Sequence, residues 1–369
     1  MSGVLAVPVL ALEQWAGVDR YAAGLARYLP EAAQPAVART LRGPRYVARY
    51  ALYPLALWSY RPALVHVLDH SYAHCLASFP GVPSVVTVHD LQPLRVIERA
   101  GRSLRAAARG WLLGWVLDWV RRADRWITVS AFTAGEAVRL LDLPAERIRV
   151  VPHAVDETFL VRPSDEAVAT RRRAWLGAAG AAGARVVLNV GTCVPRKNVE
   201  AAIRALGVLR REGVDAHLVQ IGGRFERSHV DAAAAAGVGP FVHQEPSVTE
   251  DALVAAYYAA DAVVLPSTYE GFGVPAIEAL ATGAPVVTSG AGGLAEAVGD
   301  AALVVEPEPA ALAGALARVL GDEDLRRTLV ERGRARTRAY TWDAVAAKIR
   351  SVYAELLPTT YNLQPTNRP

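Results

Sequence analysis

The segment Glu270-Gly-Phe-Gly-Val-Pro-Ala-Ile-Glu278 follows the apolar run Ala262-Val-Val-Leu-Pro266, and the two together predict the fold. A short apolar run bounded by turn-forming residues is typical of a buried strand in a parallel sheet. Pro275 suits the first turn of a helix, because the N–H that proline lacks would have no partner there. We therefore expect a strand, a glycine-containing loop and a helix that starts near Gly273, which is the repeating unit of α/β proteins.

A helix start of this kind can hold an anion. Its unpaired amides and the positive end of its dipole attract a diphosphate, and Gly271 and Gly273 let a ligand approach the backbone closely. Glu278 falls near the end of the first turn, where its carboxylate could accept hydrogen bonds from a ribose diol. Glu270, still in the loop, could meet hydroxyls of the group beyond the phosphates. The alternative is a solvated glutamate pair that only flanks a helix start.

A second segment, Val190-Gly-Thr-Cys-Val-Pro-Arg196-Lys197-Asn198, lies between an expected strand and an expected helix. Ligands of α/β sheets bind at the carboxyl ends of parallel strands. Arg196 and Lys197 could hold a diphosphate there as its negative charge grows on leaving. The chain has only two lysines, Lys197 and Lys348, against 38 arginines, which favours a specific need for lysine in this loop. The alternative is a charged first helical turn without function.

Together the two segments resemble retaining nucleotide-sugar glycosyltransferases with the GT-B fold, of family 4 and the group 1 type. The Gly-Thr…Pro-Arg-Lys-Asn form is most similar to mannosyltransferase-like members. The resemblance implies a same-face substitution in which the leaving phosphate takes the acceptor proton, with no metal and no cofactor beyond the nucleotide-sugar co-substrate. The catalytic residues that it implies are Glu270, Arg196, Lys197 and His89. The donor-binding residues that it implies are Gly17, Gly191, Thr192, Arg196, Lys197, Glu270, Gly271, Phe272, Gly273, Val274 and Glu278.

Apolar runs alternate with helical stretches along the whole chain, as in parallel α/β domains. One series of expected strands covers residues 4–10, 64–68, 84–88, 126–129 and 148–151. A second series covers residues 185–190, 216–221, 240–243, 262–265, 284–288 and 302–305. Because 369 residues are also too many for one ordinary core, we expect an α/β chain of the GT-B type. Such a chain has two Rossmann-like domains whose parallel sheets face an interdomain cleft.

The expected domain boundary follows Pro152-His-Ala-Val-Asp156, which resembles the crossover between the two GT-B domains. Residues 1–160 should form the acceptor-binding domain and residues 161–341 the nucleotide-sugar-binding domain. The resemblance implies that a last helix, at about residues 342–357, packs back on the first domain. Residues 358–369, which are rich in Pro, Thr and Asn, should form a loosely held tail.

Four residues of the first domain are further candidates. The loop after the first strand carries Gly17 and lacks the Gly-x-Gly-x-x-Gly of dinucleotide-binding domains, which argues against a dehydrogenase. The resemblance gives Gly17 a donor-phosphate contact, and the alternative is that a neighbouring polar group caps the first helix here. His89 follows an expected strand and matches the family's interdomain histidine that contacts the transferred sugar, although such a histidine is more often structural. Thr128 and Ser130 match the acceptor side, and Ser130 is equally suited to cap a helix at 131–141.

The cysteine content and the apolar stretches indicate a compartment. Cys75 and Cys193 are the only cysteines, so no disulfide framework is predicted and a reducing cytoplasm fits. The apolar run at 3–12 lacks a basic n-region and a clear cleavage site, so we interpret it as a core strand. The most membrane-like stretch, residues 111–120, contains Asp118 and is too short to cross a bilayer.

The first half of the chain carries the basic character, with a net charge of +5 over residues 1–160 against −1 over the remainder. An arginine cluster there could attract anionic lipid head groups or a lipid-diphosphate acceptor and place the protein at the inner face of the membrane. An ordinary solvated helix face is the alternative. The cluster comprises Arg95, Arg99, Arg102, Arg105, Arg109, Arg121, Arg122 and Arg125.

Two periodic patterns are interpreted as structural. Three tryptophans recur every four residues and should face the core rather than a membrane interface: Trp111, Trp115 and Trp119. Three histidines show the same spacing, but the run starts inside an expected strand and no cysteine pair joins it, so no zinc site is predicted: His66, His70 and His74.

The sequence thus predicts a glycosyltransferase that moves a hexose from a nucleoside diphosphate sugar to a hydroxyl of a glycan, a lipid-linked acceptor or a small molecule. GDP-mannose is the preferred donor, ahead of UDP-sugars and other GDP-sugars, and no nucleic-acid partner is expected. A sugar-nucleotide epimerase or hydrolase should carry a dedicated set of catalytic carboxylates or histidines. A two-domain sugar-binding protein would normally be exported. This chain shows no such catalytic set and no visible signal peptide, so we expect neither of these two classes.

Overall fold

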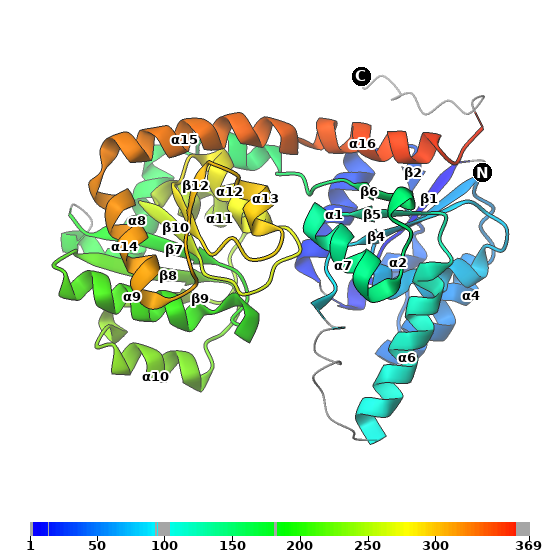
Figure 1. Ribbon diagram of the computed structural model, residues 1–369, viewed down its shortest axis with the longest axis horizontal. Helices are drawn as coiled ribbons and strands as arrows, with labels where there is room; N and C mark the ends of the chain where they lie inside the picture. The colour runs from blue at the N-terminus through cyan, green and yellow to red at the C-terminus, as the bar shows by residue number, and fades with distance from the viewer. Residues whose placement is uncertain (1–2, 14, 93, 95–103, 181–182, 359–369) are drawn as a thin grey trace. The chain divides into compact units, whose positions relative to one another are not determined.

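The computed structural model describes residues 3–13, 15–92, 94, 104–180 and 183–358. The chain divides into two compact units: unit 1 comprises residues 1–154 and 342–369, and unit 2 comprises residues 155–341. Each unit is built on a six-stranded sheet, and every strand pairing among the described residues is parallel. The expected α/β class with two Rossmann-like domains is confirmed (Figure 1). The expected boundary after residue 160 lies inside unit 2.

The strands are short, and most of their residues are buried on both faces, as in parallel sheets covered by helices on each side. The sheet of unit 1 has the order β2-β1-β3-β4-β5-β6 and the sheet of unit 2 the order β12-β11-β10-β7-β8-β9. The strands of unit 1 are β1 (Val4–Val7), β2 (Ala32–Ala33), β3 (Leu64–Val67), β4 (Ser84–Val88), β5 (Arg125–Thr128) and β6 (Ile148–Val150). The strands of unit 2 are β7 (Arg185–Val190), β8 (Ala216–Ile221), β9 (Val242–Glu245), β10 (Ala262–Leu265), β11 (Val286–Thr288) and β12 (Ala302–Val304).

Helices cover both faces of the unit 1 sheet. Strand residues of one face pack with α1 and α16, where Trp342 stacks on Tyr28 with ring centroids 5.7 Å apart. The other face packs against η3, α4, α6 and α7, and the largest fully buried side chain there is Trp126. The described helical segments of unit 1 are η1 (Ala11–Glu13), α1 (Ala16–Tyr28), α2 (Val37–Thr40), α3 (Arg45–Val47), η2 (Ala48–Leu52), α4 (Tyr53–Leu57), η3 (His70–Ser78), α6 (Leu104–Arg121), α7 (Ala131–Leu141), η4 (Ala145–Arg147) and α16 (Trp342–Ala354).

The unit 2 sheet also lies between two layers of helices (Figure 1). One face packs against α9, α10 and α14 around buried leucine, valine and alanine side chains. On the other side, α11 packs on α8 and α12, and α12 packs on α15. The helices of this unit are α8 (Asp165–Gly180), α9 (Val199–Arg211), α10 (Arg227–Ala235), α11 (Glu250–Ala259), α12 (Val274–Thr282), α13 (Leu294–Val298), α14 (Pro309–Gly321) and α15 (Glu323–Thr337).

Most expected strands occur within a few residues of their predicted positions, and two differences have a local cause. The edge strand β2 was not expected, because its two alanines form no apolar run of strand length. The strand expected at 240–243 begins at Val242, since a short 3₁₀ turn at Gly239–Phe241 contains Pro240, which cannot donate to a sheet ladder.

Two of the expectations from the sequence concern residues that the structure leaves out. The tail from residue 359 onward and the arginines at positions 95, 99 and 102 lie outside the described residues, as do the side chains of Arg105 and Arg109. Over the part of the chain that is described, none of the helices combines the length and the apolar character that a membrane span requires.

Candidate functional site

The loops that carry the two sequence motifs meet at the carboxyl ends of two central strands of the unit 2 sheet. β10 pairs directly with β7, although β8 and β9 lie between them in the sequence. From β7 the chain adds β8 and β9 on one side and then returns to add β10 on the other side, so the strand order reverses between β7 and β10. Open α/β sheets bind ligands at such a reversal, beyond the carboxyl ends of the strands. The basic loop, residues 191–198, follows β7, and the acidic loop, residues 266–273, follows β10.

The carboxylate of Glu270 is held by two cations of the basic loop. Lys197 Nζ lies 2.5 Å from Glu270 Oε1, and Arg196 Nη1 lies 3.1 Å from Glu270 Oε2. Ser267 Oγ donates to Oε1 at 2.8 Å. Glu270 is only 8% exposed. Burial alone would raise the pKa of Glu270, but the charges of Lys197 and Arg196 outweigh it and hold that pKa below its ordinary value. The carboxylate is therefore ionised at neutral pH and fixed in place.

Backbone hydrogen bonds hold the acidic loop between its two neighbours. The Thr268 N–H donates to the carbonyl of Arg196 at 2.7 Å, which ties the acidic loop to the basic loop. On the other side, the Gly293 N–H, from the loop after β11, donates to the carbonyl of Glu270 at 2.9 Å. Because β11, β10 and β7 are adjacent in the sheet, the three loops support one another.

Asn198 connects the basic loop to α9 and to the rest of the site. Its backbone is left-handed, with φ of 52°, which asparagine tolerates better than most residues. Its side-chain amide donates to the carbonyl of Pro266 at 3.2 Å and to that of Pro307 at 3.0 Å. This third position of the Arg-Lys-Asn sequence therefore has a structural role that the sequence interpretation did not assign.

The helix that follows the acidic loop starts where the sequence predicted. Gly273 is the N-cap of α12 with φ of 115°, and Pro275 occupies the first turn. Glu278, one turn further, is 1% exposed, and the hydroxyl of Tyr257 donates to its Oε2 at 2.8 Å. Tyr257 lies on α11, and no motif in the sequence connects it to the site.

The remaining candidate donor residues lie in the same two loops but differ in exposure. Gly191 is half-buried and Thr192 is exposed at the start of the basic loop. Phe272 is 4% exposed and packs edge-on against Tyr340 at 5.5 Å between ring centroids, so its side chain belongs to the core of unit 2. Val274 is half-buried in the first turn of α12.

In unit 1, His89 lies just beyond the end of β4 and pairs with a second histidine. Its Nε2 lies 2.8 Å from the carbonyl of Leu68 and its Nδ1 lies 3.2 Å from Nε2 of His153. Because a carbonyl only accepts, His89 carries its proton on Nε2, and His153 Nε2 then donates to His89 Nδ1. Burial lowers the pKa of both rings, that of His153 well below its ordinary value, so the pair is neutral at pH 7. The sequence had marked the segment of His153 only as a crossover.

The other candidates of unit 1 are split between exposed and buried positions. Gly17 is exposed in the first turn of α1, and among the described residues no side chain caps that helix. Ser130 does cap α7: its Oγ accepts from the Thr133 N–H at 3.0 Å, which confirms that alternative. Thr128 is fully buried at the end of β5, and its hydroxyl has no hydrogen-bond partner among the described residues.

The structure brings together a polar pocket of unit 1 that sequence reasoning missed. Winding reverses between β1 and β3 in this sheet, and a cavity of about 270 Å³ lies beside the loops that follow these two strands. The fully buried side chain of Glu13 pairs with Arg49 at 3.4 Å and also with Arg45. The Tyr72 hydroxyl donates to the same carboxylate at 3.0 Å. Helix α6 contributes apolar lining: Leu112, Leu113 and Val116.

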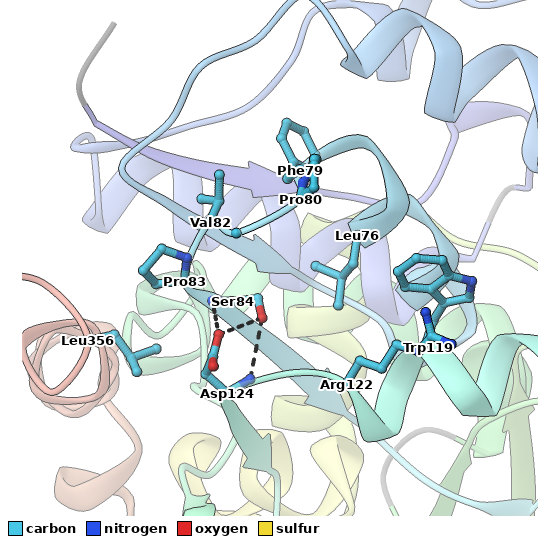
Figure 2. A pocket seen from close by; sticks show the side chains of 11 residues that line it. Leu76, Phe79, Pro80, Val82, Pro83, Ser84, Trp119, Arg122, Asp124 and Leu356 are labelled. Carbon is cyan, nitrogen blue, oxygen red and sulfur yellow. Dashed lines mark hydrogen bonds between the residues drawn. The ribbon is translucent and has the colours of Figure 1, made fainter.

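A larger cavity of unit 1, about 390 Å³, lies at the other end of the strands of the same sheet, where β4 and β5 begin. Figure 2 shows Ser84, the first residue of β4, hydrogen-bonded to Asp124 in its lining. The Asp124 carboxylate accepts from the backbone N–H of Ser84 at 2.8 Å and from its hydroxyl at 3.0 Å. None of the candidate catalytic, donor-binding or acceptor residues lines this cavity, and it sits at the amino ends of strands, so it is not part of the candidate site.

One expectation for α6 needs correction. Trp111 is 74% exposed, so it does not belong to the core, whereas Trp115 and Trp119 are half-buried. In the arginine cluster, Arg121 pairs with Asp118 at 2.9 Å and Arg125 pairs with Glu355 at 2.8 Å. The attraction of the cluster to anionic lipids stays a prediction.

Of the three regularly spaced histidines His66, His70 and His74, the first and the last have separate hydrogen-bond partners. His66 bonds to the hydroxyls of Thr87 and Tyr353, both at 2.7 Å, while His74 Nε2 lies 2.9 Å from the carbonyl of Arg49. Within the described ranges, no group of three His, Cys, Asp or Glu side chains is arranged to hold a metal ion.

Comparisons with known proteins agree with this architecture. The family model described as Glycosyltransferase Family 4 matches residues 18–159, and the one described as Glycosyl transferases group 1 matches residues 178–336. The chain is 36% identical over 294 residues to a D-inositol 3-phosphate glycosyltransferase of Acidothermus cellulolyticus, a match that covers 75% of this chain and 63% of the relative. It is 30% identical over 296 residues to an MMP alpha-(1->4)-mannosyltransferase of Mycolicibacterium hassiacum, covering 75% of this chain and 66% of that relative. The chain thus spans less than two thirds of the length of these relatives.

A solved structure has the same fold. The HepE protein of Anabaena, in complex with UDP, superposes with a TM-score of 0.75 at 19% identity, over 96% of this chain and all of the other.

Proposed function

The chain belongs to glycosyltransferase family 4, and from that premise we propose that it is a retaining glycosyltransferase. It transfers a hexose from a nucleoside diphosphate sugar to an acceptor hydroxyl. The observation that carries this proposal is the buried Glu270 carboxylate between Lys197 and Arg196 at the winding reversal of the unit 2 sheet. We assign the nucleotide-sugar donor to this site.

The cluster of three charges suits a departing diphosphate. Two cations and one carboxylate leave one net positive charge, and each cation has more N–H donors than Glu270 occupies. Arg196 and Lys197 would stabilise the leaving diphosphate, while Glu270 would orient the sugar and Glu278 would hold the ribose. The fixed positions of these groups reduce the reorganisation needed at the transition state. The phosphate itself would take the acceptor proton, with retention and without a metal.

We propose GDP-mannose as the donor, with UDP-sugars and other GDP-sugars as the next candidates. The Arg-Lys-Asn form of the basic loop and a mannosyltransferase among the relatives support this order.

We assign the acceptor to unit 1. The Glu13 pocket has a charged wall and an apolar wall, which suits a glycan or lipid-linked acceptor with a polar head. Large hydrophobic side chains are exposed on α3, α4 and α6 and at the residue that follows α4: Tyr46 (66%), Leu55 (63%), Trp111 (74%) and Trp58 (59%). They support a peripheral position on an anionic membrane from the cytoplasmic side, because aromatic side chains favour the interface between lipid and water.

Incubation with labelled GDP-mannose tests the proposed reaction. A transferase releases GDP only with an acceptor, a hydrolase releases it alone, and a binding protein releases none. Glu270→Gln should lower turnover by about a hundredfold with little change in nucleotide affinity, since that is the scale of one positioned transition-state contact. Lys197→Ala should lower both. Glu331→Gln, at an exposed position of α15, is the matched control. Full activity in both site variants would refute the site assignment.

Sedimentation with lipid vesicles tests the membrane proposal. Binding to anionic vesicles should fall as salt rises, and Trp58→Ser should weaken it at every salt concentration. Equal binding to neutral and anionic vesicles would count against an electrostatic contribution.

A further inference from the structure

A pocket of about 480 Å³ lies in unit 2 where β10 and β11 begin, at the end of these strands away from the Glu270 loop. Its lining includes Ala260, just before β10 begins, and Pro285, just before β11 begins. These are the amino ends of strands whose carboxyl ends carry the proposed donor site. The pocket is therefore separate from that site.

Three guanidinium groups line this pocket, and no Asp or Glu is among the described residues that line it. They belong to Arg162, Arg326 and Arg334. Arg162 pairs at 3.0 Å with Asp165, a carboxylate that is itself 91% exposed. Arg326 and Arg334 form no ion pair with any described carboxylate. The pocket therefore has a net positive charge that the described protein does not neutralise.

One of these arginines has a buried donor without a partner. Arg326 Nε is shielded from solvent and makes no hydrogen bond within the described chain. A buried charged donor without a partner costs about 1–3 kcal/mol or more, so the Arg326 guanidinium would gain from an added hydrogen-bond acceptor close to it.

Helix α15 presents two of the arginines on one face. Arg326, Val330 and Arg334 are four residues apart along the helix, so they lie on the same side. This side faces the end of α12: a Cβ built on Gly283 would lie 3.1 Å from Arg334 Nη2 and 3.4 Å from Val330 Cγ1. The positive charges of Arg334 and Arg162 also both act on the Tyr258 hydroxyl, although burial raises the pKa of that hydroxyl overall. The three cations thus converge on one space.

The pocket and the donor site share a helix and a hydrogen bond. Helix α12 begins at the acidic loop, and its last residue, Thr282, lines the pocket. Tyr257 also lines the pocket, and its hydroxyl donates to Glu278 at 2.8 Å. A ligand that moves Tyr257 or the end of α12 would therefore act on the side chain proposed to hold the ribose.

We propose that this pocket binds the phosphate group of a small metabolite and that its occupation changes the affinity of the donor site for nucleotide. The binding stands on unit 2 alone, whereas its effect on the donor site rests on the proposed function. Guanidinium groups match phosphate by paired N–H donors, and Tyr258 and Thr282 add hydroxyls for the remainder of the ligand. The volume fits a compact molecule such as a hexose phosphate or a nucleoside monophosphate.

Calorimetric titration of the whole protein tests the binding. The probes are inorganic phosphate, a hexose 6-phosphate and a nucleoside monophosphate, and the tightest of them identifies the source of the phosphate. Arg326→Gln and Arg334→Gln should each weaken the tightest probe about tenfold or more. Arg327→Gln is the matched control, since Arg327 lies on the same helix but is 62% exposed and pairs with Asp324 outside the pocket. Circular dichroism of each variant checks that it is folded.

Lys197→Ala distinguishes the two sites. Phosphate that binds at the pocket should bind equally well to this variant. This expectation does not depend on whether Lys197 takes part in donor binding. Loss of phosphate binding in Lys197→Ala together with normal binding in Arg326→Gln and Arg334→Gln would overturn the proposal. The absence of saturable binding by all three probes would overturn it as well.

Coupling is tested by measuring GDP affinity with and without the bound probe. A shift of about fivefold or more is expected, and by linkage GDP must shift the affinity of the probe by the same factor. Tyr257→Phe keeps the ring but removes the hydrogen bond to Glu278, so probe binding should persist while the shift shrinks. An undiminished shift in Tyr257→Phe would refute this route between the sites.

Discussion

Lys197→Met is the most direct test of how the candidate site is held together. The substitution keeps an unbranched side chain of similar length but removes the ammonium group that lies 2.5 Å from Glu270 Oε1. The side chain of Lys197 is 14% exposed and that of Glu270 is 11% exposed, so solvent screens this pair only weakly.

The expected loss of stability follows from the groups that remain. Removing the only partner of a buried charge typically costs about 3–5 kcal/mol. Here Arg196 and Ser267 still bond to the Glu270 carboxylate, so we expect the loss of a single charged hydrogen bond, about 2 kcal/mol. For a unit of the size of residues 155–341, this loss should lower the melting temperature by about 4–8 °C.

The effect should also depend on pH in a defined direction. Because the folded-state pKa of Glu270 is below its ordinary value, the stabilisation is complete above the pKa of the unfolded chain, near 4.5. It is lost as pH falls through the lower folded-state pKa. The difference between wild type and Lys197→Met should therefore be constant from about pH 6 to 8 and shrink below about pH 4.

Thermal and urea denaturation followed by circular dichroism would measure the difference. The control is Lys348→Met, which changes the only other lysine, at an exposed position of α16. A double-mutant cycle with Glu270→Gln should give a coupling energy of about 1–2 kcal/mol. Equal stability of Lys197→Met and Lys348→Met, with no coupling in the cycle, would refute this account of the cluster.

Three further outcomes are expected. Gly293→Ala should disrupt the acidic loop and abolish GDP binding in calorimetry, because a Cβ at Gly293 would clash with the carbonyl oxygen of Gly271. Gly314→Ala is the control: a Cβ there would meet no other atom, so GDP binding should be unchanged. Asn198→Ala should destabilise unit 2 by about 2–3 kcal/mol in urea denaturation, since it removes two amide hydrogen bonds and strains a left-handed residue, and Asn198→Gly should recover only the backbone part. Burial lowers the pKa of His66 to about 3, so at mildly acidic pH the unfolded chain binds a proton that the folded chain does not. The free energy of unfolding of unit 1 should therefore fall as pH falls below about 6.5. His66→Gln should make this dependence on pH less steep, and an unchanged dependence would contradict the prediction.

The sequence predicted the elements of this fold well because their signals are local. The apolar run before the acidic loop and the proline after it were sufficient to place β10 and the start of α12. It also predicted that Lys197 and Glu270 belong to one site, since each motif follows a strand of a parallel sheet and such strand ends meet at one edge. The exposure of Trp111 was missed because a periodic apolar face does not reveal which turn of a helix extends beyond its packing partner.

The amino-acid sequence by itself determined where strands and helices form, which loops carry charge, and the family to which the chain belongs. Only the tertiary structure decided which side chains share a hydrogen bond: Tyr257 with Glu278, His153 with His89, and Arg49 with Glu13. Strand and helix signals arise from neighbours within a few residues, whereas these pairs are set by strand order and by helix packing across distant parts of the chain. The same holds for the arginine pocket, because its positive charge becomes a site only when α15 packs beside the end of α12.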